Sequence, residues 1–331
     1  MTKSKARVIG TGSYLPERIL TNKDLEKIVD TTDEWIVTRT GMHERRIAAE
    51  GEYTSDMAVY AARKALKAAQ MEAKDLDVIL VATSTPDYIF PSTSAIVQHA
   101  LGAPEVPSLD IQAACTGFLY GLSIAKGYVE SGMYKTVLVV ASEKLSAITN
   151  YKDRATCVLF GDGAAACVVS DKGEGFTIQS VTLGADGKEQ DLLTLRGGGC
   201  RHPASQASVE NDLHYISMEG KEVFKHAVRR MESAARECME KANIPETAIN
   251  WFVPHQANER IISSTAKRFN LSNDRVFRTV HKYGNTSASG IVIALDELIR
   301  GEKIEEGENI LLVAFGAGFT WGASILTKEK A

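Results

Sequence analysis

The stretch that decides the fold is residues 110–122, DIQAACTGFLYGL. A short apolar strand is predicted over Val106–Ile111, and after a turn of small residues a helix is predicted from about Cys115 to Ser131. Cys115 is thereby expected at a strand-to-helix corner, where the partial positive charge and unpaired N–H groups of a helix N-terminus favour a thiolate. A structural cysteine is the alternative at this point, because Cys is also a common small core residue.

The composition is that of an ordinary soluble protein. Of 331 residues, 44% are hydrophobic and 24% charged, and the formal net charge is -4, so nothing indicates binding to nucleic acid or to an anionic membrane. The five cysteines form no CxxC pair, and neither a disulfide framework nor a metal site is expected. MTKSKARVIG lacks the apolar region of a signal peptide, and the apolar runs are only of strand length. A cytoplasmic location is expected.

Strands alternate with helices along the chain, which predicts a layered α/β fold. Two buried strands recur later in the sequence at a constant offset, since 251 minus 78 and 310 minus 137 both give 173. The corresponding strands are Val78–Ala82 with Trp251–His255, and Val137–Ala141 with Ile310–Ala314. A polar, Gly-rich segment begins near Gly173 and divides the chain into two similar halves, residues 1–173 and 174–331. A repeat of this length indicates duplicated halves rather than a solenoid.

Three polar side chains follow buried strands or begin helices in this scheme. The same offset carries Cys115 to Ala288, three residues past Asn285, so Cys115 and Asn285 lie near the starts of equivalent helices. His255 stands in a polar corner directly after a strand. Taken alone, His255 also fits a core histidine, and Asn285 fits a helix N-cap. Together with the Gly-rich turn after Phe315, their symmetric placement predicts an active site where the halves meet, at the carboxyl ends of the strands.

The segment TTDEWIVTRTGMHERRI (31–47) combines polar residues with Trp35, Arg39, Arg45 and Arg46. It is compatible with a solvated loop anchored by one aromatic side chain. It is equally compatible with a site for a flat ring and phosphates, because indole stacks and guanidinium groups bind phosphate. GTGSYLP near the N-terminus lacks the third glycine of a dinucleotide fingerprint, so a nucleotide site of that kind is not expected there.

These motifs resemble the β-ketoacyl-acyl-carrier-protein synthase III family, the initiating condensing enzymes of bacterial fatty-acid synthesis within the thiolase superfamily. The matching stretches, which span nearly the whole chain, are TTDEWIVTRTG (31–41), DIQAACTGF (110–118), FGDGAAA (160–166), VPHQANERI (253–261), YGNTSASG (283–290) and FGAGFTWG (315–322). The resemblance implies a five-layer αβαβα sandwich of two similar halves, a homodimer, and a catalytic triad of Cys115, His255 and Asn285.

The resemblance also implies a reaction in two stages that needs no cofactor. Cys115 takes an acetyl group from acetyl-CoA, and malonyl-acyl-carrier protein then loses CO2 and attacks the acetyl thioester, giving acetoacetyl-acyl-carrier protein. His255 and Asn285 would donate hydrogen bonds to the enolate oxygen left by decarboxylation. The oxyanion of acyl transfer would be held by the backbone N–H groups of Cys115 and Ala317. The family usually has glycine at the latter position, and a positive φ there would strain an alanine.

Binding residues are carried over from the same resemblance. The residues implied for CoA, with adenine between Trp35 and Arg154, are Thr31, Trp35, Arg39, Arg154, Gly220, Phe224, Ala257 and Asn258. Those implied for docking the acidic acyl carrier protein are Lys225, Gln256, Arg260, Lys267 and Arg268, with Glu259 adding a negative charge beside them. Phe90, in the loop DYIFPS, would close the end of the partner subunit's acyl pocket and favour a short straight primer.

Several alternatives stay open on the sequence alone. A related synthase of secondary metabolism would use another acyl-CoA primer, and a type III polyketide synthase would not depend on a patch for the carrier protein. A Cys-His-Asn hydrolase is disfavoured because the CGSCW motif of papain-like enzymes is absent. A non-catalytic binding subunit of the same fold would be expected to lose its cysteine.

Overall fold

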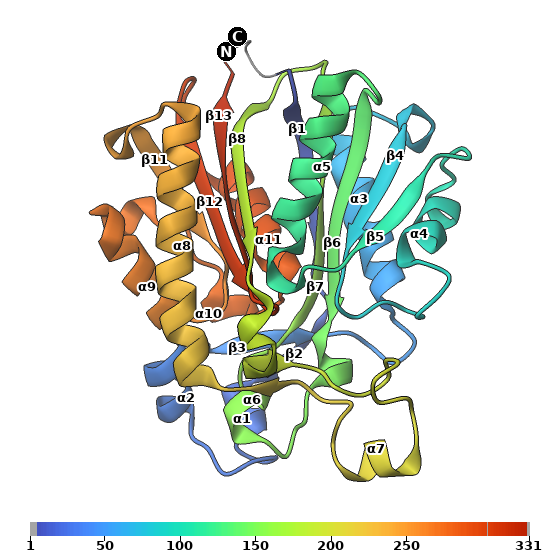
Figure 1. Cartoon of the computed structure of the whole chain (residues 1–331), viewed down its shortest axis with the longest axis vertical. Coiled ribbons are helices and arrows are strands. Elements are labelled where there is room, and N and C mark those ends of the chain that lie inside the picture. Colours follow the sequence, from blue (N-terminus) through green and yellow to red (C-terminus); the bar gives the residue numbers. More distant parts are fainter. Residues whose placement is uncertain (1–4, 303, 330–331) are drawn as a thin grey trace.

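A nine-stranded sheet runs through the computed structural model, which describes residues 5–302 and 304–329 (Figure 1). Residues 1–4, part of the segment for which no signal peptide is expected, lie outside the described residues. In spatial order the strands are β11 (Ile249–Pro254), β12 (Asn309–Gly316), β13 (Thr320–Lys328), β8 (Phe176–Ala185), β1 (Arg7–Tyr14), β7 (Asp162–Ser170), β6 (Thr136–Lys144), β4 (Val78–Ala82) and β5 (Ser108–Ile111). Two small sheets pair β2 (Arg18–Thr21) with β3 (Glu44–Ile47), and β9 (Leu193–Thr194) with β10 (Ser217–Met218).

The two halves of the large sheet are joined by a short antiparallel contact between β1 and β8, in which Val8 lies opposite Phe176. Each half contains a parallel pair with the same register. In β4 and β6 Val78 lies opposite Val137, and in β11 and β12 Trp251 lies opposite Ile310. The partners are 59 residues apart in both cases, since 137 minus 78 equals 310 minus 251. The same unit is therefore built twice.

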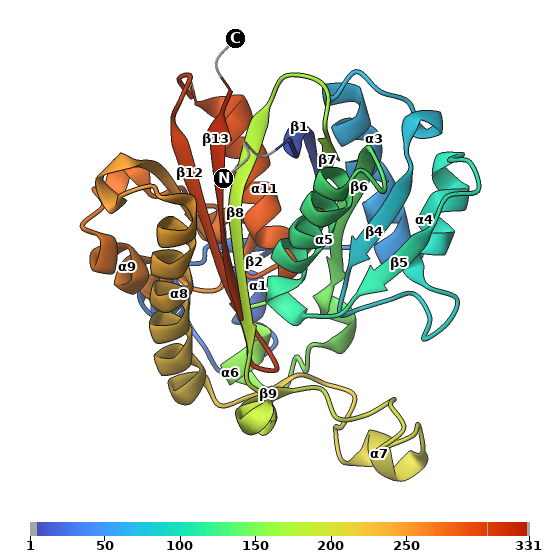
Figure 2. The same ribbon diagram turned by 45° about the horizontal axis from the view of Figure 1, so that its top comes forward.

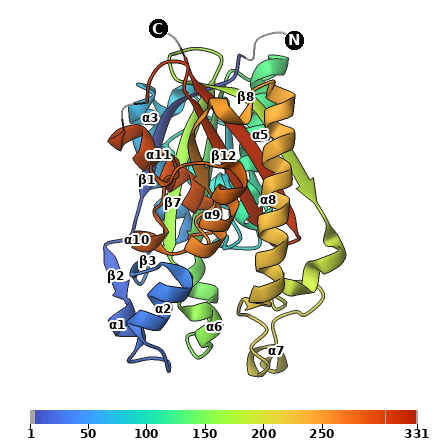
Figure 3. The same ribbon diagram turned by 90° about the vertical axis from the view of Figure 1, so that its left-hand side faces the viewer.

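Helices cover both faces of each half and give five layers (Figures 1 and 2). The outer layers are α3 (Thr54–Ala68) with α4 (Thr93–Leu101) on the first half, and α8 (Gly220–Ala242) with α9 (Glu259–Ala266) on the second. The middle layer is α5 (Gly117–Ser131) with α11 (Ala288–Gly301), which contact strands of both halves. The shorter helices are α1 (Asn22–Leu25), α2 (Asp33–Thr40), α6 (Arg154–Cys157), α7 (Gln206–Glu210) and α10 (Val280–Tyr283). Figure 3 shows α1, α2 and α6 gathered at one end of the molecule, with α7 beside them. The predicted αβαβα sandwich is confirmed.

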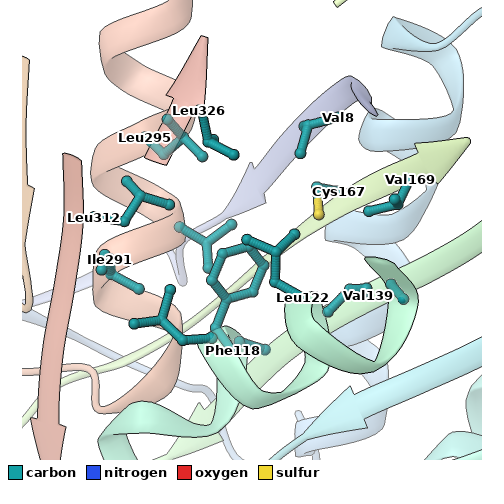
Figure 4. Packing of buried hydrophobic residues seen from close by; sticks show 14 of the residues in the cluster. Val8, Phe118, Leu122, Val139, Cys167, Val169, Ile291, Leu295, Leu312 and Leu326 are labelled. Carbon is teal, nitrogen blue, oxygen red and sulfur yellow. The ribbon is translucent and has the colours of Figure 1, made fainter. Parts of the chain in front are cut away.

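Three apolar cores follow this layering, one beneath α3, one beneath α8 and one around the middle layer. In the middle core Phe118 and Leu122 of α5 pack near Ile291 and Leu295 of α11 (Figure 4). All four side chains are fully buried, and burial of one such side chain stabilises the fold by about 1.5–3 kcal/mol. This packing fixes the starts of the two helices, where the predicted site residues lie.

Some elements differ from the sequence prediction. Cys115 lies in a 3₁₀ turn, Ala114–Thr116, ahead of α5. Residues 31–47 are not a loop, because Thr32 caps α2 by accepting a hydrogen bond from Trp35 N and Gly41 ends the helix at φ +74°. The prediction missed α2 because only Ile36 of its apolar side chains is fully buried, which gives too weak a helical period.

A polar, Gly-rich segment was expected from about Gly173 onward, but the ten-residue strand β8 begins at Phe176. The irregular part starts after Ala185 and contains only short elements. Gly173 lies in the turn between β7 and β8, and the division into two halves at that residue stays a prediction.

Candidate active site

A cavity of about 1020 Å³ opens at the carboxyl ends of strands from both halves. Cys115, His255 and Asn285 all line it. Cys115 follows β5, His255 follows β11, and Ala317 follows β12 in the same wall. The structure thus brings together the three residues that the sequence placed 30 to 170 positions apart, since 285 minus 255 is 30 and 285 minus 115 is 170.

The corner that carries Cys115 has a strained backbone. Ala114, the preceding residue, has φ +46°, and Ser287, which lies 173 positions later, has φ +52°. Each precedes the first turn of a middle-layer helix, so the duplicated unit repeats its strained corner. A positive φ outside glycine costs about 1–3 kcal/mol and is concentrated at functional sites. Asn285 stands two residues before the second corner.

The Gly-rich turn after β12 lies against the Cys115 corner. A Cβ added to Gly316 would lie 2.7 Å from Cys115 N, so only glycine allows this approach. Thr320 joins the two segments, because its Oγ1 lies 3.0 Å from Ala113 O and 3.1 Å from Ala317 O, and its one hydroxyl hydrogen can be donated to either. Ala317 has no positive φ, and the alanine at this position is therefore unstrained.

Burial keeps both titratable members of the site neutral at pH 7. It raises the pKa of the Cys115 thiol to about 12, an effect that the Ser287 hydroxyl partly opposes. It lowers the pKa of His255 to about 4. His255 N donates to Val313 O at 2.7 Å, while the ring Nδ1 is buried without a hydrogen-bond partner. The resting site is thus a neutral thiol beside a neutral imidazole, rather than an ion pair.

Asn285 is held on both sides by the segment that precedes β7. Its N donates to Leu159 O at 2.8 Å, and its carbonyl oxygen accepts from Gly161 N at 3.0 Å. The side-chain Oδ1 accepts from Ser287 N at 2.9 Å. With Oδ1 engaged by the backbone, the amide NH2 is left as the hydrogen-bonding end of this side chain, and it is a donor.

Comparisons with known proteins show the family of the chain. Residues 109–187 match the family described as 3-oxoacyl-[acyl-carrier-protein (ACP)] synthase III, and residues 239–328 match its C-terminal family. A β-ketoacyl-[acyl-carrier-protein] synthase III of Chlamydia trachomatis serovar D is 60% identical over 97% of this chain and 99% of its own. The chain belongs to the β-ketoacyl-acyl-carrier-protein synthase III family.

Solved structures give the same family. A 3-oxoacyl-[acyl-carrier-protein] synthase III from Aquifex aeolicus VF5 has a TM-score of 0.89 and 47% identity, covering 97% of this chain and 99% of that one. The priming β-ketosynthase of the R1128 polyketide pathway has the same TM-score, 36% identity, and covers 99% and 98%. As a member of the synthase III family, the chain is a condensing acyltransferase that initiates fatty-acid synthesis.

The mouth of the cavity carries the aromatic group predicted from the sequence. The guanidinium carbons of Arg39 and Arg154 each lie 4.9 Å from the centre of the Trp35 ring. Arg154 also donates to Asp30 O at 3.0 Å. Because Arg154 contacts the indole directly, a flat ring enters between them only if this arginine moves. Arg45 is no phosphate ligand, since it is fully buried and donates to Asn22 and to backbone carbonyls.

Other residues carried over from the synthase III family divide into three groups. Six line the cavity, namely Gly220, Phe224, Lys225, Ala257, Asn258 and Arg260. Lys267 and Arg268 are exposed beyond α9. Thr31 and Phe90 do not line the cavity of their own chain. The side chain of Phe90 is 85% exposed, whereas the hydroxyl of Thr31 is buried without a partner.

The assignment of Gln256 to carrier-protein docking is wrong. Its side chain is 1% exposed. Its amide nitrogen donates to Pro254 O at 2.7 Å, and its Oε1 accepts from Thr279 N at 2.8 Å and Val280 N at 3.1 Å. A side chain bonded in this way positions the turn beside His255 and presents nothing to a partner.

Sequence reasoning missed three polar residues of this region. Ser287 and Thr320 line the cavity, and Glu143 is buried at the end of β6. The 173-residue offset could have pointed to Ser287 as the equivalent of Ala114. An acidic residue two positions after an apolar strand was the available signal for Glu143. In the part of the chain that the structure describes, no cluster of side chains suited to a metal and no helix able to span a membrane is found.

Proposed function

We propose that the chain condenses acetyl-CoA with malonyl-acyl-carrier protein, giving acetoacetyl-acyl-carrier protein, CO2 and CoA, with Cys115 carrying the acetyl group between the two stages. The observation that carries the proposal is that Cys115, His255 and Asn285 line one cavity at the strand ends of the two halves. The reaction joins atoms already present in the two thioesters, so it calls for no cofactor.

In the first stage the Cys115 sulfur attacks the thioester carbonyl of acetyl-CoA. The proton lost from the thiol passes to the departing CoA sulfur, so that no charge remains in the buried site. The tetrahedral oxyanion is held by the backbone N–H groups of Cys115 and Ala317. The close approach at Gly316 supports this assignment, because it places the two backbone segments side by side.

In the second stage the malonyl thioester loses CO2, and its carbonyl oxygen gains the negative charge of an enolate. A neutral imidazole N–H from His255 and the amide NH2 of Asn285 donate hydrogen bonds to that oxygen. The enolate carbon then attacks the acetyl-Cys115 carbonyl, and the Cys115 thiolate leaves and takes up a proton from solvent, which is the one proton that the overall reaction consumes. The lowered pKa of His255, about 4, keeps the imidazole neutral throughout.

The substrates would enter through the mouth beside α2. CoA would be held by Trp35 with Arg39 and Arg154, after Arg154 swings from the indole. Further CoA contacts would come from Thr31 and from four residues that line the cavity, namely Gly220, Phe224, Ala257 and Asn258. Acyl carrier protein, which is acidic, would dock on the basic residues around this mouth, Lys225, Arg260, Lys267 and Arg268. Glu259 weakens this patch little, because Arg278 pairs with it at 3.0 Å.

A homodimer in the cytoplasm completes the proposal. Tyr88, Ile89 and Phe90 are 62%, 82% and 85% exposed. Three consecutive large apolar residues in water mark an interaction surface. A second subunit would cover them, and Phe90 would then reach the partner subunit's acyl pocket.

A panel of acyl-CoA primers, each offered with malonyl-acyl-carrier protein, tests the proposal. Acetyl-CoA is expected to give the highest kcat/KM, with release of CO2 and formation of acetoacetyl-acyl-carrier protein. Preference for a branched or longer primer would instead favour a priming synthase of secondary metabolism. The 36% identity to the R1128 priming enzyme is compatible with that alternative. Thioester hydrolysis without CO2 would indicate a hydrolase, and no acylation at all would indicate a binding subunit.

A further inference from the structure

Gln256 carries a buried amide group whose hydrogen bonds join two separate segments of the second half. Its Nε2 donates to Pro254 O at 2.7 Å and to Phe277 O at 3.3 Å. Its Oε1 accepts from Thr279 N at 2.8 Å and from Val280 N at 3.1 Å. Two N–H groups and two lone pairs are all that an amide side chain offers, so its capacity is fully used. Turning the amide over would set donor against donor and acceptor against acceptor, and its orientation is therefore fixed.

The NH2 side of this amide holds the peptide unit that leads into His255. The carbonyl of Pro254, which accepts from Gln256, belongs to the peptide bond between Pro254 and His255. The N–H of the same peptide bond donates to Val313 O at 2.7 Å. Both polar groups of this peptide are thus bonded, and the direction in which the imidazole leaves the backbone is fixed with them.

The oxygen side of the amide holds α10, the helix that precedes Asn285. Thr279, the N-cap residue of α10, supplies no side-chain cap. The first N–H groups of a helix have no partner within it, and for Thr279 and Val280 the partner is Gln256. At the other end of the helix Gly284 N donates to Val280 O at 3.0 Å, one residue before Asn285. The position of α10 therefore sets where the Asn285 side chain begins.

We propose that Gln256 is a positioning residue for the decarboxylation stage, because it holds the segments of His255 and Asn285 in one fixed arrangement. These two side chains would donate to a single enolate oxygen, and such a donor works over a window of only about 2.7–3.1 Å. A misplacement of about 1 Å can cost about 10²-fold in rate. None of the four bonds of Gln256 reaches the corner that carries Cys115, so acetyl transfer should not depend on it. The inference rests on the proposed roles of His255 and Asn285.

The test measures the two stages separately in Gln256→Met, a side chain of similar length without the amide. Acetylation of Cys115 by acetyl-CoA should keep its wild-type rate. Release of CO2 at saturating malonyl-acyl-carrier protein should slow by about 10²-fold, with KM nearly unchanged. A residue that docks the carrier protein would give the reverse pattern, a raised KM with kcat preserved.

Hydrogen exchange of the α10 backbone gives a readout that does not depend on activity. The N–H groups of Thr279 and Val280 lose their partner in Gln256→Met, so they should exchange faster than in the wild type. Gln256→Asn is a milder second variant, because it keeps an amide that is too short to bond both segments at once. It should also slow CO2 release and leave the acetylation of Cys115 intact.

Asn309→Leu is the matched control for the loss of a buried amide. Asn309 donates to Ala248 O at 2.9 Å and accepts from Thr327 Oγ1 at 2.6 Å. It begins β12, whereas the site lies at the carboxyl end of that strand. The control should lose stability and slow neither stage.

Three results in folded Gln256→Met would each overturn the proposal: equal slowing of both stages, a raised KM with kcat preserved, or unchanged exchange of α10. Should Gln256→Met fail to fold, the same readings on Gln256→Asn decide. Failure of both variants to fold also overturns the proposal, because the amide would then serve stability alone. Wild-type protein that releases no CO2 from malonyl-acyl-carrier protein would instead overturn the proposed function, and the exchange of α10 would still report on Gln256.

Discussion

Gly316→Ala should separate acyl transfer from folding. The new Cβ would lie 2.7 Å from Cys115 N, 3.2 Å from Thr116 N and 3.3 Å from Ala114 Cβ. Ordinary contact begins near 3.4 Å, so the Cys115 backbone nitrogen must retreat by about 0.7 Å. An oxyanion donor works over a window of only about 2.7–3.1 Å. The retreat therefore removes the donor, and acyl transfer should slow by about 10²–10³-fold.

The assay is the rate of acetyl incorporation into Cys115 from acetyl-CoA, with a thermal melt beside it. Overpacking at this contact should cost about 1–3 kcal/mol, which leaves most of the protein folded. Gly127→Ala is the matched control, because Gly127 lies within α5 and an added Cβ meets nothing within 4 Å. The control should acylate normally and gain up to about 1 kcal/mol of stability. Wild-type acylation in folded Gly316→Ala would refute the placement of the oxyanion donor.

Four other changes test separate parts of the account. Asn285→Ala should slow CO2 release by about 10²–10³-fold and leave acetylation intact, and the opposite pattern in the two stage assays would reverse the assigned roles. Lys225→Glu should raise KM for malonyl-acyl-carrier protein in a salt-sensitive way but not KM for acetyl-CoA, whereas Lys241→Glu, at the other end of α8, should change neither. Phe90→Thr should raise kcat/KM for isobutyryl-CoA relative to acetyl-CoA about tenfold, and an unchanged ratio would exclude Phe90 from specificity. Glu143→Gln should raise the free energy of unfolding at pH 8 by up to about 3 kcal/mol and should change it little at pH 4.5. Burial raises the pKa of the wild-type Glu143 carboxyl to about 7, so the wild-type protein loses stability as the pH rises from the ordinary pKa of a glutamate to that value. Equal gains at both pH values in denaturant titrations would contradict this.

Much of the architecture could be predicted because buried strands and amphipathic helices carry strong periodic signals. The bounds of β4 agree with the prediction at both ends, and α5 ends at Ser131 as predicted. The 173-residue offset between apolar strands also predicted where the halves meet, and Cys115 and His255 lie there. Signals of this kind are local, or they repeat, and a single sequence displays them.

The remainder depends on contacts between distant segments. Gln256 is polar and follows His255, so the sequence allows it on the surface, and only the nearby backbone groups of Thr279 and Val280 reveal that it is buried. The buried Arg45 was misjudged for the same reason. Glu143 gave a weak signal because its hydrogen-bond partners Ser84 and Thr85 are 59 and 58 residues away. Such polar pairs are set by tertiary structure and leave no period in the sequence.

The central claim is that Cys115 carries the acetyl group, and the mass of the protein after incubation with acetyl-CoA alone tests it most directly. The account predicts a gain of one acetyl group, mapped to the peptide that contains Cys115. It predicts no gain in Cys115→Ser, because a serine hydroxyl does not supply the nucleophilic anion that a thiol can. Condensation that proceeds without this adduct, or an acetyl group found on another residue and retained in Cys115→Ser, would contradict the account.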